Sequence, residues 1–212
     1  MEIKLAEQQL KLLSEKAIYW TSQEALIISD LHLGKASHFR KSGIAIPELA
    51  EKKDLQILTR TIRRHKPKKI YFLGDLFHSE YNTSWDQFCN WCSTYDAIDF
   101  YLIQGNHDIL APEMFERAGL KMVQELLIDS ILLTHDEVKT EYFNIHGHIH
   151  PGYKVNLGAK QKTTLACFAL FKHKLIMPAF GSFNGFVTIN QLNADQIFLI
   201  VDNELIELPL IL

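Results

Sequence analysis

Side chains that can bind metal ions are grouped in five short polar motifs, and each motif comes directly after an apolar run. The motifs are Asp30-Leu31-His32, Gly74-Asp75, Gly105-Asn106-His107-Asp108, Thr134-His135 and Gly147-His148-Ile149-His150. They supply seven side chains with oxygen or imidazole nitrogen donors: Asp30, His32, Asp75, Asn106, His135, His148 and His150. That set is large enough to hold two divalent metal ions.

The donor types indicate which chemistry such a site would perform. Carboxylate, amide and imidazole donors without a thiolate motif suit manganese, iron or zinc at a hydrolytic centre better than a Cys-rich structural zinc site. Two ions about 3.5–4 Å apart can hold a phosphate, lower the pKa of a shared water and stabilise both oxygens of an in-line displacement. The sequence therefore predicts a hydrolase of phosphoesters with two divalent metal ions. Manganese is expected first, with iron or zinc as alternatives.

Each motif taken alone has a simpler interpretation. A lone histidine is usually an ordinary core or surface residue, and Asn106-His107-Asp108 is also typical of a turn. Five motifs, each behind a predicted strand, favour the metal site over these alternatives. His135 has weaker support than the others because it rests on a single residue.

The apolar runs predict the strands that position the motifs. These runs are residues 25–28, 70–73, 100–103, 131–133 and 143–145. The first four are continuous, as in strands that are buried on both faces. Loops at the carboxyl ends of neighbouring parallel strands share one crevice. We therefore expect the five motifs to converge at one edge of the fold.

The remaining pattern predicts helices in the first part of the chain and strands in the last part. Helices are expected from Pro47 to just before Pro67, over about 84–95, and after Pro112. Further strands are expected at 3–5, 17–20, 163–171, 174–177, 185–189, 196–201 and 204–208. We expect an α/β fold in which helices cover both outer faces of two stacked mixed sheets.

Length and composition indicate one compact enzyme domain. The chain has 212 residues and no recognisable linker, so we expect a single domain over residues 1–212. A net charge of −3 excludes a globally basic protein that coats nucleic acid. The sequence shows neither a signal-peptide core at Met1 nor an apolar run of membrane-spanning length. We expect a cytoplasmic protein that is not in a membrane.

The five motifs, in this order, resemble the signature of the calcineurin-like metallophosphoesterases, which is D-x-H, GD, GNH[D/E], H and GHxH. The resemblance implies a four-layer α-β-β-α sandwich. It also implies two metal sites that share Asp75. The first would use Asp30, His32, Asp75 and His150, and the second Asp75, Asn106, His135 and His148.

The same resemblance implies that His107 donates a proton to the leaving oxygen while Asp108 holds its ring in position. The chain departs from the phosphoprotein phosphatase branch, which has GD-x-x-DRG and GNHE. Here the second motif reads Gly74-Asp75-Leu76-Phe77-His78-Ser79, and the third ends in Asp108. These departures weigh against a protein phosphatase.

A longer segment is similar to the PdeM family of bacterial ligase-associated DNA damage response endonucleases. It covers residues 30–47, reads DLHLGKASHFRKSGIAIP, and is followed by further similarity at 74–79 and 148–151. The resemblance implies a metal-dependent phosphodiesterase that acts on DNA in repair. It also implies that a DNA ligase, a helicase and an exonuclease are partners.

Basic side chains near the first motif are candidates for substrate binding. Lys35, His38 and Arg40 follow the first ligand pair and can bind phosphates that flank the scissile one. The alternative is a solvated basic loop. His78 either contacts the substrate or donates a hydrogen bond to a metal ligand.

Three functions are compatible with this pattern. A DNA endonuclease or phosphodiesterase is the leading interpretation, and a phosphohydrolase of nucleotides or other small phosphoesters is the alternative. A scaffold without activity would be expected to lose ligands or the proton donor. This chain retains Asp75, His107 and the other motif residues, which disfavours the scaffold.

Overall fold

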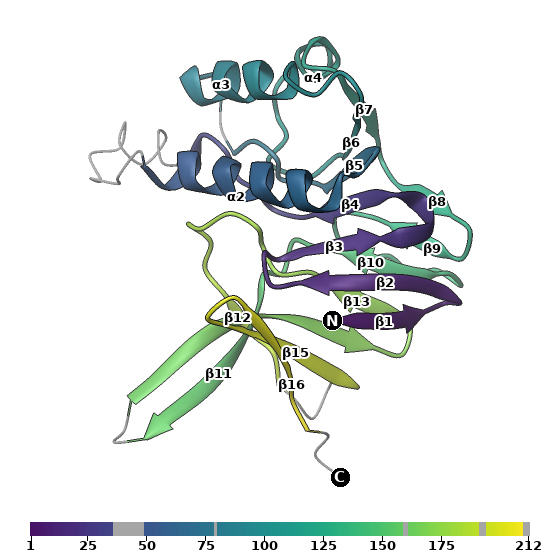
Figure 1. Cartoon of the computed structure of the whole chain (residues 1–212), viewed down its shortest axis with the longest axis vertical. Coiled ribbons are helices and arrows are strands. Elements are labelled where there is room, and N and C mark those ends of the chain that lie inside the picture. The colour runs from purple at the N-terminus through teal and green to yellow at the C-terminus, as the bar shows by residue number, and fades with distance from the viewer. Residues whose placement is uncertain (36–48, 79, 159–160, 191–193, 210–212) are drawn as a thin grey trace.

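The computed structural model describes residues 1–35, 49–78, 80–158, 161–190 and 194–209. Two mixed sheets stack on one another (Figure 1). The strands of the first sheet, in spatial order, are β1 (Glu2–Leu5), β2 (Gln8–Leu13), β3 (Ala17–Trp20), β4 (Ala25–Ile28), β5 (Lys69–Leu73), β6 (Asp99–Ile103) and β7 (Leu120–Val123). Neighbours from β1 to β4 are antiparallel, and those from β4 to β7 are parallel. A short 3₁₀ helix, η1 (Thr21–Gln23), joins β3 to β4.

The second sheet is built from the remaining strands. They are β8 (Leu126–Ile128), β9 (Ile131–Leu133), β10 (Phe143–His146), β11 (Pro151–Gly158), β12 (Gln161–Phe171), β13 (Lys174–Ile176), β14 (Val187–Thr188), β15 (Gln196–Val201) and β16 (Glu204–Glu207). Their order is β14-β11-β12-β13-β10-β9-β8, and β15 pairs with both β12 and β16. The strands β9, β10 and β13 run parallel. Both sheets are therefore mixed, as predicted.

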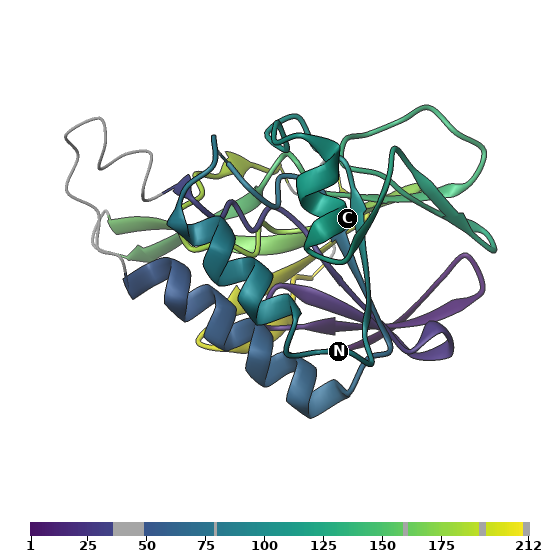
Figure 2. The same cartoon turned by 90° about the horizontal axis from the view of Figure 1, so that it is seen from above.

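Among the described residues, three helices cover the outer face of the first sheet: α2 (Leu49–His65), α3 (Thr83–Cys92) and α4 (Pro112–Arg117) (Figures 1 and 2). They contribute buried Leu58, Phe88 and Phe115 to a core that also contains Leu26 and Phe72 from the sheet. Helix α3 begins where the Asn82 side chain accepts a hydrogen bond from the Ser84 N–H at 2.9 Å, which caps its first turn. The predicted α/β sandwich is confirmed.

The outer face of the second sheet differs from the expectation of a second helical layer. Its buried residues Cys167, Ile197 and Leu199 pack against Ile189 and Leu208. In the described ranges, irregular segments and strands cover this face instead of helices. None of the helices in these ranges is both long and apolar enough to cross a membrane.

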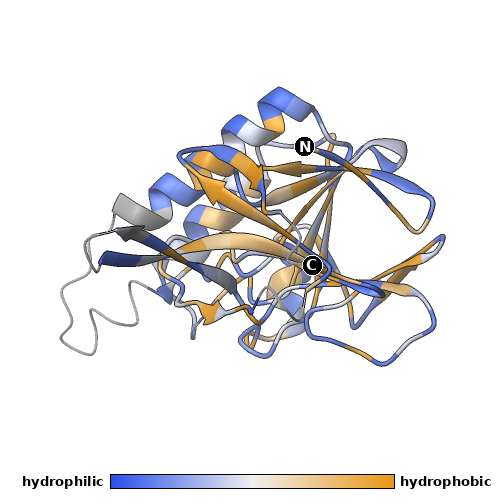
Figure 3. Cartoon of the chain, turned by 90° about the horizontal axis from the view of Figure 1, so that it is seen from below, coloured by the Kyte–Doolittle hydropathy of each residue, from blue (hydrophilic) through white to orange (hydrophobic). Residues whose placement is uncertain are grey.

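A second core fills the space between the sheets. Ile27 and Leu73 of the first sheet pack with Leu133, Ile145 and Phe168 of the second, and all five are fully buried. The central strands thus face helices on one side and a sheet on the other, which is why their apolar runs are continuous. Figure 3 shows apolar, orange segments gathered in the strands, while α2 and the loops are largely blue.

Several strands lie where the sequence pattern gave no strand prediction: β2, β7, β8 and β11. The strand β11 contains Gly152, Lys154, Asn156 and Gly158, which are residue types with low β-propensity. It becomes a strand because its backbone pairs with the longer β12 over most of its length. Tertiary pairing therefore overrides local preference in this segment.

The inter-sheet core yields a stability prediction for Leu133→Ala. Leu133 is fully buried between the sheets, so its truncation is expected to lower the free energy of unfolding by about 3–5 kcal/mol. Leu127→Ala on the neighbouring strand β8 is the matched control, because Leu127 is 44% exposed. That variant should lose less than about 1 kcal/mol. Urea unfolding followed by circular dichroism measures both, and equal losses would contradict the assignment of the core.

Candidate metal centre

The five motifs converge because the strands that precede them end at the same edge of the two sheets. In the first sheet, β4, β5 and β6 are parallel neighbours and lead to the first three motifs. In the second sheet, β9 and β10 are parallel neighbours and lead to the last two. The stacked sheets thus bring all seven predicted ligand side chains to one place.

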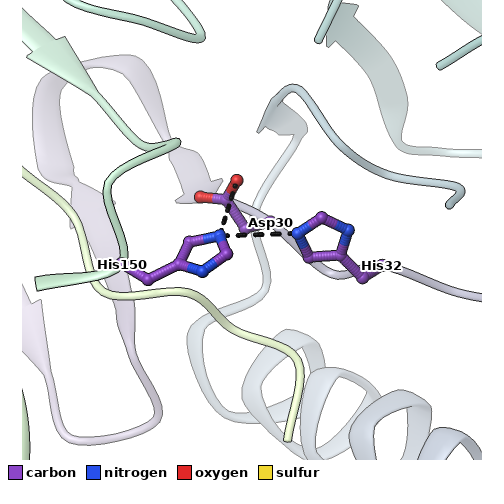
Figure 4. A group of neighbouring side chains, drawn as sticks. All are labelled: Asp30, His32 and His150. Atoms are coloured by element: carbon purple, nitrogen blue, oxygen red, sulfur yellow. Dashed lines mark hydrogen bonds and ion pairs between the residues drawn. The ribbon is translucent and has the colours of Figure 1, made fainter. Parts of the chain in front are cut away.

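Asp30, His32 and His150 form the first ligand group (Figure 4). One ligand atom from each lies within 4.8 Å of the others. The His150 Nε2 is 3.3 Å from Asp30 Oδ1 and 3.4 Å from His32 Nε2. Figure 4 shows the carboxylate and the two rings directed toward one another, as three ligands of one ion would be.

The carboxylate of Asp30 fits a bound cation. Its Oδ2 accepts hydrogen bonds from the Ser29 hydroxyl and, at 3.0 Å, from the His148 N–H. Its Oδ1 is buried and has no hydrogen-bond partner in the described part of the chain. A buried carboxylate oxygen without a partner is costly, and a metal ion would compensate it.

His32 is suited to bind metal as a neutral imidazole. Burial, together with the neighbouring positive charge of Lys35, lowers the pKa of His32 to about 2. The ring is therefore neutral at physiological pH, and metal binding at this residue displaces no proton. The Nδ1 of His32 lies 3.1 Å from Nδ1 of His78.

Asp75, His135 and His148 form the second ligand group. The His135 Nδ1 lies 2.9 Å from the Leu73 carbonyl oxygen, and donation to that carbonyl leaves the lone pair on Nε2. Asn106 Oδ1 and His148 Nδ1 each lie 3.0 Å from this Nε2, and Asp75 Oδ1 lies 3.4 Å from it. The ligand atoms of Asp75, His135 and His148 lie within 4.8 Å of one another, close enough to bind one divalent cation.

Asp75 lies between the two groups. Its Oδ1 faces His135 at 3.4 Å, and its Oδ2 faces His32 Nε2 at 3.7 Å. The carboxylate is 2% exposed, and its Oδ1 also accepts a hydrogen bond from the His107 N–H at 2.9 Å. One oxygen is thus directed to each group, which is the geometry of a carboxylate shared by two ions.

Most of the ligand residues have an unusual backbone conformation. A left-handed φ occurs at Asp30 (51°), His32 (50°), Asp75 (49°), His148 (63°) and His150 (51°). This region costs about 1 kcal/mol or more for a residue with a Cβ, although Asp, Asn and His tolerate it best. Such strain collects at functional sites, where the surrounding structure enforces it. The motif spacing gave no sign of this feature.

The glycines of the motifs are required by close packing. A Cβ on Gly147 would lie 1.6 Å from Ser29 Oγ, and one on Gly105 would lie 2.3 Å from the Asp75 nitrogen. A Cβ on Gly74 would lie 2.3 Å from His135 Nδ1. Each glycine therefore lets a ligand-bearing loop approach its neighbour closely.

His107 and His78 lie at the opening of the site. The His107 side chain is 42% exposed, and its Nε2 is 3.9 Å from Asp75 Oδ2. Its ring centroid lies 4.2 Å from that of His78. His107 is thus placed beside the metal ligands without joining either group.

Asp108 joins the loops that follow β5 and β6. Its carboxylate accepts hydrogen bonds from the N–H groups of Leu76 (2.9 Å), Phe77 (3.1 Å) and Gly105 (2.8 Å). Burial raises the pKa of Asp108 to about 7, although the hydrogen bonds from the Gly105 and Phe77 amides oppose the shift. The orientation of the His107 ring by Asp108 stays a prediction, because the bonds described for this carboxylate go to backbone amides.

Of the four predicted substrate-binding residues, the structure describes Lys35 and His78. Lys35 Nζ donates to Asn184 Oδ1 at 2.9 Å, and Asn184 Nδ2 donates to the Asp30 carbonyl at 3.0 Å. Asn184 was not predicted as a site residue, because it follows β13 and belongs to none of the five motifs. His38 and Arg40 lie outside the described residues.

The packing of Gly147 yields a prediction for metal binding. Gly147→Ala would force Ser29 and Asp30 away from their positions, since a Cβ would also lie 2.4 Å from Asp30 Oδ2. We expect bound manganese per chain, measured by elemental analysis, to fall to about half or less, because the first ligand group is disrupted. Gly185→Ala is the control, because a Cβ there meets no atom within 4 Å. A Gly147→Ala protein with full metal content would contradict the site geometry.

Comparisons with known proteins identify what the chain is similar to. The family model described as calcineurin-like phosphoesterase matches residues 25–197. The crystal structure of the nuclease MPE from Pseudomonas putida is similar, with a TM-score of 0.83 and 25% identity over 98% of this chain and 99% of that one. The E. coli phosphoesterase Yfce matches with a TM-score of 0.46 and 12% identity over 88% of this chain and 98% of that one. No curated protein sequence matches significantly.

Proposed function

The chain belongs to the calcineurin-like phosphoesterase family, and from this premise we propose that it is a dinuclear phosphodiesterase that cleaves DNA. The family makes it a metal-dependent phosphoesterase. The observation that supports the dinuclear site is the carboxylate of Asp75, whose two oxygens face the two ligand groups. The likeness to a nuclease over nearly the whole of both chains supports a nucleic acid as the substrate. The resemblance of residues 30–47 to the DNA damage response endonucleases favours DNA.

We assign each ligand group to one divalent ion. Asp30, His32 and His150 would hold the first ion and Asn106, His135 and His148 the second, and Asp75 would serve as a ligand in both sites. When bound, the ions supply Lewis-acid stabilisation of the phosphate and activation of water. Manganese is the proposed metal, with iron or zinc as alternatives, because the donors are oxygen and imidazole.

His107 is the proposed general acid. Its exposed ring can reach a substrate above the metal ligands, and its backbone N–H is held by Asp75. A protonated imidazole there would give its proton to the leaving oxygen of the diester. The neighbouring His78 ring restricts the orientations that His107 can adopt.

Lys35 is the proposed phosphate-binding residue in the described part of the chain. Its ammonium group is fixed by Asn184, which also contacts the Asp30 backbone. His38, Arg40 and His78 are proposed to contribute to substrate binding as well. We further propose that the protein acts in the cytoplasm, in DNA repair, together with a DNA ligase, a helicase and an exonuclease.

Replacement of His107 separates proton donation from metal binding. His107→Ala is expected to keep its metal content while kcat falls by about 10²–10⁴, with the largest loss for poor leaving groups. His173→Ala is a matched control, because His173 is exposed in the turn between β12 and β13, away from the metal centre. Elemental analysis and steady-state kinetics on diesters with different leaving groups measure both effects. Loss of metal from His107→Ala would show that it is a ligand instead.

The substrate class is tested with circular single-stranded DNA. Purified protein with manganese is incubated with the circle, with bis-p-nitrophenyl phosphate and with p-nitrophenyl phosphate, and Asp75→Ala serves as the inactive control. Cleavage of the circle and of the diester, absent from the control, is the expected result. Hydrolysis of the small esters with an intact circle would identify a small-molecule phosphohydrolase.

A further inference from the structure

The strands β11 and β12 form a ribbon that starts at the metal centre. Pro151, the first residue of β11, directly follows the ligand His150. On its other side, in the part of the chain that the structure describes, β11 pairs with β14 only at Pro151 and Gly152. Beyond that point the ribbon projects from the body of the protein, as Figure 1 shows.

One face of this ribbon carries polar and basic side chains. Lys154 pairs with Thr164 and Asn156 pairs with Lys162, so these four residues lie on the same face. By strand alternation it is the face that carries Phe168 further along β12, in the core between the sheets. The face therefore continues the inner side of the second sheet, which is directed toward the first sheet and its ligand loops.

The charge of this region is unbalanced. The segment 142–194 contains five lysines and neither Asp nor Glu, in a chain whose net charge is −3. Lys154 and Lys162 are exposed and have no ion-pair partner in the described ranges. Four other lysines are paired with carboxylates: Lys4 with Glu7, Lys68 with Glu24, Lys121 with Asp99 and Lys174 with Glu137. The ribbon thus presents positive charge that no neighbouring carboxylate neutralises.

An exposed aromatic side chain lies at the base of the same face. A Cβ on Gly152 would lie 2.7 Å from the Phe186 Cβ, which places Phe186 against the ribbon between His150 and Lys154. Phe186 is 46% exposed. It follows closely after Asn184, which binds Lys35 and the Asp30 backbone. Metal ligands, aromatic ring and lysines therefore follow one another along a single path.

We propose that this face of the β11–β12 ribbon binds a single-stranded nucleic acid segment that leads away from the metal centre. The inference rests on the proposed function for the position of the scissile bond. Phe186 stacks on a base, and Lys154 and Lys162 bind phosphates. At about 3.3 Å per residue, Lys154 lies about 13 Å along the strand from His150. The lysines therefore contact flanking nucleotides and not the phosphate that is cleaved.

The test measures binding separately from cleavage. Variants are made in the manganese-loaded His107→Ala protein, and binding of a fluorescein-labelled oligothymidylate of about 20 nucleotides is followed by anisotropy at several KCl concentrations. Lys154→Gln with Lys162→Gln should reduce the salt slope by about 1.4 and the affinity by about 25-fold at about 0.1 M KCl. Phe186→Ala should weaken binding by about fivefold or more without changing the slope.

Matched controls show whether binding depends on where these residues lie or only on the charge and ring that the substitutions remove. Lys66→Gln with Lys172→Gln removes the same charge from exposed positions at the other end of the strands, and Tyr142→Ala removes an exposed aromatic ring there. Both should bind as the parent does. Equal losses in the control and ribbon variants, or a ribbon variant that binds like the parent, would overturn the proposal.

Two further outcomes are informative. If duplex DNA binds as tightly as the single strand and Phe186→Ala has no effect, the assignment to a single strand is wrong. The ribbon variants in the otherwise unaltered chain are also assayed on circular single-stranded DNA. If these variants cleave the circle with an unchanged KM, the proposal that the ribbon binds the strand is wrong, while the proposed nuclease function stands. If binding depends on the ribbon but the protein cleaves only small esters, the ribbon is supported as a binding surface and the proposed nuclease function is wrong.

Discussion

The structure depends on holding two buried carboxylates, Asp30 and Asp75, beside one another. Each is almost completely removed from solvent, and burial of like charges is unfavourable unless cations or hydrogen bonds compensate it. Adjacent parallel strands impose the proximity, since Ile28 of β4 is in register with Phe72 of β5. The loops then continue the pairing, with the Asp30 N–H donating to the Gly74 carbonyl and the His32 N–H to the Asp75 carbonyl. The two ligand groups are therefore set by the register of two strands.

The same edge also joins the two sheets. The His148 N–H donates to Asp30 Oδ2, and the Phe180 and Gly181 N–H groups donate to the carbonyls of Ser29 and Asp30. Loops of the second sheet thus bond to the first ligand loop at both its backbone and its carboxylate. A change that moves one sheet relative to the other would alter the imidazole positions around both carboxylates. This coupling explains why the site can be dispersed over most of the chain and still be well defined.

Much of this arrangement could be predicted because it follows from patterns that the sequence displays directly. Strands buried on both faces leave continuous apolar runs, and the ligands follow those runs immediately, so their convergence could be inferred. Asn184 could not be found in this way, because its role comes from contacts with Lys35 and the Asp30 backbone and not from any motif. The ribbon strand β11 was missed for a related reason. Its glycines and polar residues disfavour a strand locally, and only pairing with β12 makes it one.

The left-handed backbone at five of the ligands also restricts which metal ions the site can bind. Among residues with a Cβ, that conformation is tolerated best by Asp, Asn and His. These side chains offer oxygen and imidazole donors, whereas the thiolate of Cys brings no comparable tolerance. The turns that direct Asp30, His148 and the other ligands inward therefore favour Asp, Asn and His over Cys at these positions. Substitutions that are compatible with these turns therefore keep donors that suit the metals of hydrolytic enzymes, and they do not introduce the thiolates that copper(I) and other soft ions prefer.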